Sequence, residues 1–152
     1  MTGIRDVQAE DREAFLDMWA DFVSLAPDEP GNHGVMGELN WSRMIDPAHA
    51  LKALIATDEN GAAVGFTLYL PFAFTWARGD VCYLQDIYVR AQARGKGIAQ
   101  AMIAELEKRG RDAGWFKVFW MTQADNFTAQ RVYDKVAKRM DYLRYDLNVC
   151  EP

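Results

Sequence analysis

Histidine and cysteine are scarce in this chain of 152 residues, which holds two of each. Cys82 lies in an apolar run and Cys150 lies near the chain end, and neither is spaced for metal binding with His33 or His49. We therefore expect no metal site. We also expect both thiols to be reduced, as is usual in a cytoplasmic protein.

Positive charge and long apolar runs are also lacking. The chain carries 17 Lys and Arg against 22 Asp and Glu, a net charge of −5, so a nucleic acid, which needs a basic face, is not an expected partner. No apolar run is long enough to span a membrane, and the polar start at Met1 to Gln8 is not expected to be a signal peptide. Half of the residues are hydrophobic and no repeat interrupts the pattern, which predicts one domain over residues 1–152.

The first half of the chain predicts two helices followed by an antiparallel meander. Apolar residues recur at helical spacing over Asp11 to Leu25, and a loop rich in Pro and Gly, Ala26 to Gly37, separates them from a short helix over Glu38 to Ile45. Three strands joined by the turns Asn60-Gly61 and Arg78-Gly79-Asp80 are then expected. These strands are Leu51 to Thr57, Ala63 to Phe74 and Val81 to Val89.

The second half predicts a crossover between parallel strands. A helix from Ile98 to about Arg109 is followed by a strand over Trp115 to Thr122, a helical stripe over Ala129 to Val136 and an alternating closing strand over Leu143 to Val149. The order is β-α-α-β-β-β-α-β-α-β. We therefore predict an α/β fold with a central mixed sheet flanked by helices.

The most informative segment is Gln92-Ala93-Arg94-Gly95-Lys96-Gly97-Ile98-Ala99, which joins a strand to a helix. Two glycines allow the backbone to approach a bound group closely, and the first N–H groups of the helix point outward without partners. Such a turn is suited to phosphate or pyrophosphate, and Arg94 and Lys96 add positive charge there.

Three pieces of sequence resemble the GNAT superfamily of acetyl-CoA-dependent N-acetyltransferases. They are the turn Gln92-x-x-Gly95-x-Gly97 after its strand, the tract of Asn126 with Ala129 and Tyr133, and the order of elements. The tract from Trp120 onward is similar to the branch with histone, polyamine and D-amino-acid acetyltransferases. One departure is Lys138 to Tyr142, where many members have Gly followed by Phe or Tyr, and it affects the path into the last strand.

The resemblance implies a GNAT-like acyl-CoA N-acyltransferase fold with acetyl-CoA as cosubstrate. Backbone groups of the strand before the turn would pair with the pantetheine arm, N–H groups from Arg94 to Gln100 would hold the pyrophosphate, and Asn126 would bind the arm near the thiol. The cofactor-binding residues that it implies are Ile87, Tyr88, Val89, Arg94, Gly95, Lys96, Gly97, Ile98, Ala99, Gln100, Asn126 and Tyr133.

The resemblance also suggests the catalytic groups. Tyr133 would protonate the leaving thiolate, and Asp86 would accept the proton of the acceptor ammonium, directly or through water. Gln85, which stands where many relatives have Glu, cannot act as a base. The residues leave alternatives open: Asp86 in a structural hydrogen bond, Tyr133 as a core aromatic, and Asn126 as a helix cap.

The acceptor is expected to be a primary amine of a small molecule, either a polyamine or an amino-acid-like compound. Its site in relatives nominates Trp19, Phe22, Asp28, Glu29, His33, Glu38 and Trp41, of which Trp19 and Phe22 are also expected core residues. Two other functions fit the sequence, a catalytically silent acetyl-CoA sensor and a peptide lysine acetyltransferase. A homodimer that pairs through Tyr142 to Val149 is expected.

Overall fold

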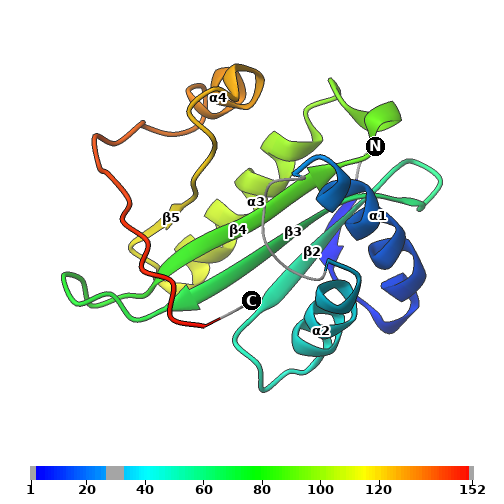
Figure 1. The fold of residues 1–152 in the computed structure, drawn as a ribbon, viewed down its shortest axis with the longest axis horizontal. Helices are drawn as coiled ribbons and strands as arrows, with labels where there is room; N and C mark the ends of the chain where they lie inside the picture. Colours follow the sequence, from blue (N-terminus) through cyan, green and yellow to red (C-terminus); the bar gives the residue numbers. More distant parts are fainter. Residues whose placement is uncertain (1–2, 27–32, 151–152) are drawn as a thin grey trace.

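A computed structural model describes residues 3–26 and 33–150 and has a five-stranded sheet at its centre (Figure 1). The strands lie in the order β1-β2-β3-β4-β5; the first four are antiparallel neighbours, and β5 runs parallel to β4. This arrangement confirms the predicted mixed α/β sheet. The strands are β1 (Gly3–Asp6), β2 (Lys52–Thr57), β3 (Ala63–Phe72), β4 (Val81–Val89) and β5 (Lys117–Phe119).

Helices cover both faces of the sheet. Helices α1 (Arg12–Ser24) and α2 (His33–Ile45) pack on one face, and α3 (Ile98–Ala113) packs on the other (Figure 1). The short helix α4 (Phe127–Tyr133) follows β5, and 3-10 turns lie at Ala9–Asp11 and Ala91–Ala93. These elements lie largely where the sequence periodicity predicts them, because each helix has one apolar stripe and each central strand is buried.

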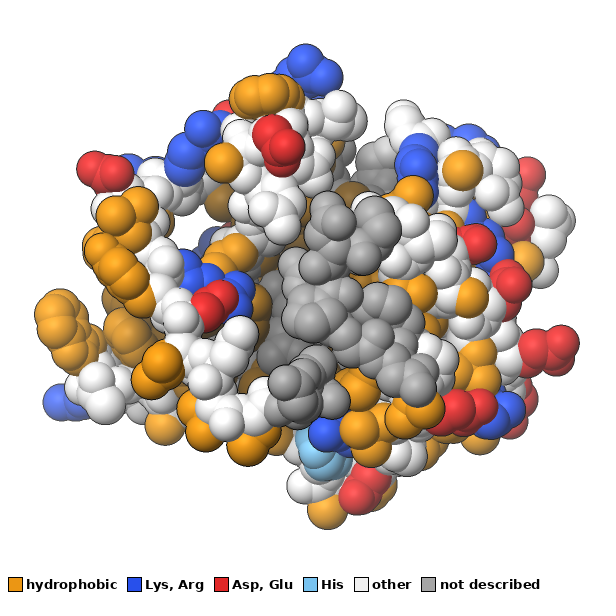
Figure 2. Space-filling model, in the orientation of Figure 1, with side chains coloured by type: hydrophobic (Ala, Val, Ile, Leu, Met, Phe, Trp, Pro, Cys, Tyr) orange, Lys and Arg blue, Asp and Glu red, His pale blue; other side chains and the backbone are white. Residues whose placement is uncertain are grey.

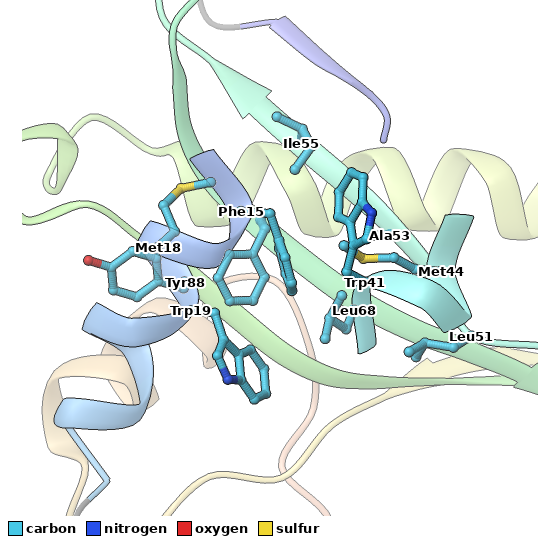
Figure 3. Close-up of a cluster of buried hydrophobic side chains, with 11 residues drawn as sticks. Phe15, Met18, Trp19, Trp41, Met44, Leu51, Ala53, Ile55, Leu68 and Tyr88 are labelled. Atoms are coloured by element: carbon cyan, nitrogen blue, oxygen red, sulfur yellow. The ribbon is translucent and has the colours of Figure 1, made fainter. Parts of the chain in front are cut away.

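The core under α1 and α2 is largely aromatic. Phe15 of α1 meets Phe66 of β3 edge-on with ring centroids 5.2 Å apart, and Trp41 of α2 lies 6.0 Å from the same Phe15 ring. Figure 3 shows Phe15 and Trp41 among the buried side chains gathered between the helices and the sheet. Burial of these large side chains therefore holds the two helices on the sheet. Each side chain contributes roughly several kcal/mol to the stability of the fold.

Helix α2 begins earlier than the sequence suggested. The predicted loop ran to Gly37, but the helix starts at His33 and includes both Gly34 and Gly37. Gly37 serves helix packing instead of a turn, because a Cβ there would lie 2.8 Å from Cδ1 of Trp19 in α1. The small residue lets the two helices approach closely, a tertiary role that local sequence does not distinguish from a loop signal.

The elements after the glycine turn differ in length from the prediction. Helix α3 continues past Arg109 to Ala113 and ends at Gly114, whose φ of 74° is left-handed. Strand β5 holds only Lys117–Phe119 and does not extend over Trp115 to Thr122.

The predicted closing strand over Leu143 to Val149 is wrong for the described chain, since residues 138–149 form no helix or strand. The alternation is present, but no edge of the sheet pairs with this segment. A strand needs hydrogen-bonded neighbours. Its apolar side chains instead remain more than four-fifths exposed: Leu143 82%, Tyr145 88%, Leu147 88% and Val149 86%.

Within the described ranges, no helix combines the length and the apolar character needed to cross a lipid bilayer.

Candidate active site

A wedge opens between β4 and β5. The two strands pair only where Val81–Tyr83 of β4 meets Lys117–Phe119 of β5. Beyond this point β4 continues to Val89 with no strand beside that edge in the described chain, and Figure 1 shows β5 turning away toward α4. An unpaired stretch of a central strand is unusual, because its N–H and C=O groups need partners. The open edge is therefore a candidate binding surface for an extended ligand.

The backbone groups that face this wedge can be deduced from the ladder. The amide of Arg90 donates to the carbonyl of Val64 at 2.8 Å, and Gly65 lies opposite Val89. Because inward and outward pairs alternate in an antiparallel ladder, the N–H and C=O groups of Ile87 and Val89 point away from β3. On the open side, Nε of Arg94 already donates to the Val89 carbonyl at 2.9 Å.

The glycine turn lies at the end of this edge. Gly95 and Gly97 have φ values of 77° and 76°, a left-handed conformation that other residues adopt only with strain. Gly97 caps α3, and the first helical hydrogen bond runs from the Ala101 amide to its carbonyl at 2.9 Å. The amides of residues 98–100 precede that bond and have no acceptor within the helix, so they are available to an anion at its positive end.

The positive side chains of the turn differ in their surroundings. Arg94 bends back over the ring of Tyr88, with its guanidinium carbon 5.8 Å from the ring centroid. Arg90 ties the end of β4 to α1 through an ion pair of 2.7 Å with Asp17. Sequence reasoning missed Arg90, because its partner lies far away in the chain. Lys96 is exposed beside the glycines.

Asp86 stands at a β-bulge of β4. The register shifts there, so that Leu68 pairs with Asp86 and Tyr69 pairs with Leu84, leaving Gln85 as the exposed extra residue. Asp86 shares a sheet face with Leu68, and burial raises the pKa of its carboxyl to about 6. In residues 3–26 and 33–150 no hydrogen bond donor or cation contacts this carboxylate, while the hydroxyl of Thr67 donates to its backbone carbonyl at 2.9 Å. A carboxylate in this setting can gain or lose a proton near neutral pH.

Helix α4 carries the other predicted groups. The side chain of Asn126 accepts a hydrogen bond of 3.2 Å from the amide of Ala129, so Asn126 is the N-cap of α4. Tyr133 packs edge-on against Trp120 with centroids 5.4 Å apart, and burial raises the pKa of its phenol. The phenol therefore remains protonated at neutral pH and is able to donate a proton.

The residues nominated for the acceptor are not gathered in one place. Trp19 and Trp41 are buried core residues, and Phe22 packs on Trp19 at 5.6 Å. Glu38 is exposed and pairs with Arg12 at 2.7 Å. Asp28 and Glu29 lie outside the described residues, as does the His33 side chain. Trp19 and Glu38 both line a groove of about 320 Å³ between α1 and α2, together with Leu16, Ala20, Val23, Gly34 and Gly37.

Sequence reasoning also missed the aromatic pair at the closed end of the wedge. Tyr83 and Phe119 are the last partners of the β4–β5 ladder, and their rings stack with centroids 5.0 Å apart and 4° between their planes. Only the register of the two strands brings them together.

No group of three or more His, Cys, Asp or Glu side chains able to hold a metal ion occurs in the described part of the chain.

Comparison with known proteins gives a consistent result. Residues 12–137 match the acetyltransferase (GNAT) family. The chain is 31% identical over 150 residues to a D-amino-acid N-acetyltransferase of Saccharomyces cerevisiae, covering 95% of this chain and 89% of the relative. It is 27% identical over 105 residues to a thialysine N-epsilon-acetyltransferase of Caenorhabditis elegans, covering 62% and 64%. A ribosomal-protein-alanine N-acetyltransferase from Brucella melitensis has the same fold, with a TM-score of 0.81, 21% identity and coverage of 98% and 100%.

Proposed function

Because the chain belongs to the acetyltransferase (GNAT) family and is therefore an acyltransferase, we propose that it transfers an acetyl group from acetyl-CoA to a primary amine of a small molecule, a polyamine or an amino-acid-like compound. One observation carries the proposal. The open edge of β4 leads directly into an anion-binding turn at the start of α3, which suits an extended arm that ends in a pyrophosphate.

Different parts of the wedge bind different parts of acetyl-CoA. The outward backbone groups of Ile87 and Val89, on either side of Tyr88, pair with the amides of the pantetheine arm as a neighbouring strand would. The amides of Ile98, Ala99 and Gln100 hold the pyrophosphate, which Arg94 and Lys96 neutralise. Asn126 retains unused hydrogen-bonding capacity toward the arm while it caps α4.

Acetyl-CoA supplies an activated acetyl group as a thioester, and side chains of the protein accept and donate the protons of the reaction. In its ionised form Asp86 accepts a proton from the acceptor ammonium, directly or through water, which leaves a nucleophilic amine. Tyr133 donates its phenolic proton to the departing thiolate and regains a proton from the nitrogen of the new amide, which loses its second proton as the amide forms. No covalent enzyme intermediate is required, and burial raises the pKa of the Cys82 thiol to about 12, which makes it a poor nucleophile.

The relatives support a small amine as the acceptor. Two of them are a D-amino-acid N-acetyltransferase and a thialysine N-epsilon-acetyltransferase, and both acceptors are amino acids. We propose the same class of reaction for this chain. A cytoplasmic location stays a prediction. The unpaired thiols of Cys82 and Cys150 agree with it.

The first experiment measures thiol release from acetyl-CoA with polyamines, D- and L-amino acids, aminoglycosides and lysine-rich peptides. Turnover on a small amine above background hydrolysis supports the proposal. Tight acetyl-CoA binding without turnover on any acceptor would favour a sensor. Turnover on peptides alone would favour a protein-modifying enzyme.

We also propose that the chain forms a homodimer through the segment Tyr142 to Val149. Antiparallel pairing of this segment with its copy about Tyr145 sets Leu143 opposite Leu147 and Arg144 opposite Asp146. Apolar side chains then lie opposite apolar side chains, and each positive charge lies opposite a negative one. Burial of these exposed side chains supplies the driving force. Light scattering at micromolar concentration should give the mass of two chains, and Tyr145→Asp should give one. A monomeric mass for the unaltered protein would refute the proposal.

A further inference from the structure

The face of β4 that carries Asp86 also carries Tyr83, and the two define a surface beside the wedge. Leu68 and Leu70 of β3 pair with Asp86 and Tyr83 respectively, so the bulge at Gln85 keeps both side chains on one face. Tyr83 stacks on Phe119, which gives this surface a flat aromatic end. Asp86 is the carboxylate at its other end.

The C-terminal segment brings a cation to the aromatic end of this surface. Nη1 of Arg144 lies 3.6 Å from the sulfur of Met121, two residues beyond Phe119, and Nε of Arg144 donates to Asp146 at 2.6 Å. Arg144, Asp146 and Asp86 all lie close enough to Tyr83 to act on the pKa of its phenol, which burial raises. The Arg144 side chain is 61% exposed, so a solute in this space can reach it.

The contacts of the segment show which of its side chains lie toward the sheet. Arg144 contacts Met121, and Arg144 and Asp146 both act on Tyr83, whereas Leu143, Tyr145 and Leu147 are more than four-fifths exposed. Figure 2 shows hydrophobic side chains along the outer side of this segment and charged side chains on its inner side, where the surface is hollowed.

We propose that Arg144 binds the carboxylate of the acceptor while Asp86 receives its ammonium group, so that the acceptor is an amino acid and not a polyamine. The inference rests on the proposed function, since it assigns the specificity of the same site. A guanidinium forms paired hydrogen bonds with a carboxylate, and Asp146 fixes its orientation through Nε. A polyamine would place a second cation against Arg144, which is unfavourable.

The test uses amine pairs that differ only by a carboxylate: lysine with cadaverine, and phenylalanine with phenethylamine, each amino acid in both enantiomers. The unaltered protein should acetylate an amino acid at a kcat/KM at least about tenfold above that of its decarboxylated partner. Arg144→Gln should raise KM for the amino acid about 10- to 100-fold and should not lower the rate with the simple amine, since that amine has no carboxylate for Arg144 to bind. KM for acetyl-CoA should not change. Arg144→Lys should restore part of the loss.

Arg139→Gln is the matched control: Arg139 is as exposed as Arg144 and likewise pairs with an aspartate, Asp134, but it is not among the charges that act on Tyr83. It should leave every rate unchanged. Equal use of both members of each pair, or preference for the simple amine, would overturn the inference and leave the proposed function standing. An unchanged KM in Arg144→Gln would also overturn it. No thiol release with any amine would refute the proposed function itself, and this inference with it.

Discussion

Asp86→Asn should remove activity and at the same time stabilise the protein at neutral pH. Burial holds the pKa of Asp86 at about 6, above its ordinary value of 3.8, because the charged form loses hydration that nothing in its described surroundings replaces. A carboxyl whose pKa is higher in the folded than in the unfolded state makes the fold more stable at low pH, and this contribution is lost as pH rises through about 6. Compared with a neutral side chain at position 86, the carboxyl lowers the free energy of unfolding by about 3 kcal/mol at pH 7 and by about 0.5 kcal/mol at pH 4.

The expected measurements follow from these values. Urea unfolding should show Asp86→Asn more stable than the unaltered protein by up to about 3 kcal/mol at pH 7, with the gain shrinking toward pH 4. In the unaltered protein, kcat/KM should fall about tenfold between pH 7 and pH 5, since the ionised fraction falls from about nine-tenths to about one-tenth. An exposed carboxylate of α3 supplies the control, Asp112→Asn, which should change neither quantity. A flat rate profile from pH 5 to 7, or equal stability at pH 7, would refute the argument that burial makes Asp86 a base.

Three further changes probe other parts of the molecule. Gly97→Val should lower acetyl-CoA affinity in calorimetry at least about tenfold, because φ at 97 is 76°, whereas Gly61→Val, at an equally left-handed turn with φ of 84°, should strain the fold and spare affinity. Tyr133→Phe should lower turnover about 100-fold while acetyl-CoA affinity is retained, and the exposed Tyr142→Phe should do neither; equal turnover would return Tyr133 to a packing role. Arg5→Ala should destabilise the fold by about 1–3 kcal/mol, because Arg5 donates twice to the buried Asp11 at 2.7 and 2.8 Å. Although burial raises the pKa of Asp11, the hydrogen bonds from Arg5 and Gln8 outweigh this and lower it, so the loss should be full above about pH 4 and shrink as pH falls; a loss that persists at low pH would contradict this.

The features that the sequence predicted well are those that depend on near neighbours. The turn at Asn60-Gly61 and the glycines 95 and 97 all have the left-handed or turn geometry that their residue types favour, and strand β4 has its predicted bounds. Helix α3 follows an amphipathic pattern that needs no partner to be recognised. The candidate cofactor wedge lies along these local features, which is why its residues could be named in advance.

The features that the sequence did not predict depend on distant parts of the chain. Gly37 reads as a loop residue until Trp19 of another helix is seen to pack on it. The stacking of Tyr83 on Phe119 and the approach of Arg144 to Met121 require the register of a parallel ladder and the path of the C-terminal segment. The same segment has the alternation of a strand, but alternation alone does not supply a neighbouring edge. Long-range pairing therefore limited the prediction more than local propensity did.

The wedge between β4 and β5 also bears on how such a protein can change its substrate. In the proposed site the acetyl donor is held mainly by main-chain groups at residues 87, 89 and 98–100, which almost any side chain leaves in place. The acceptor, in contrast, meets side chains such as Asp86 and Arg144. Arg144 lies on an exposed terminal segment that the core does not constrain. Mutations can accumulate there at little cost to folding, so a descendant can acquire a new amine preference while the machinery that handles the acetyl donor is inherited intact.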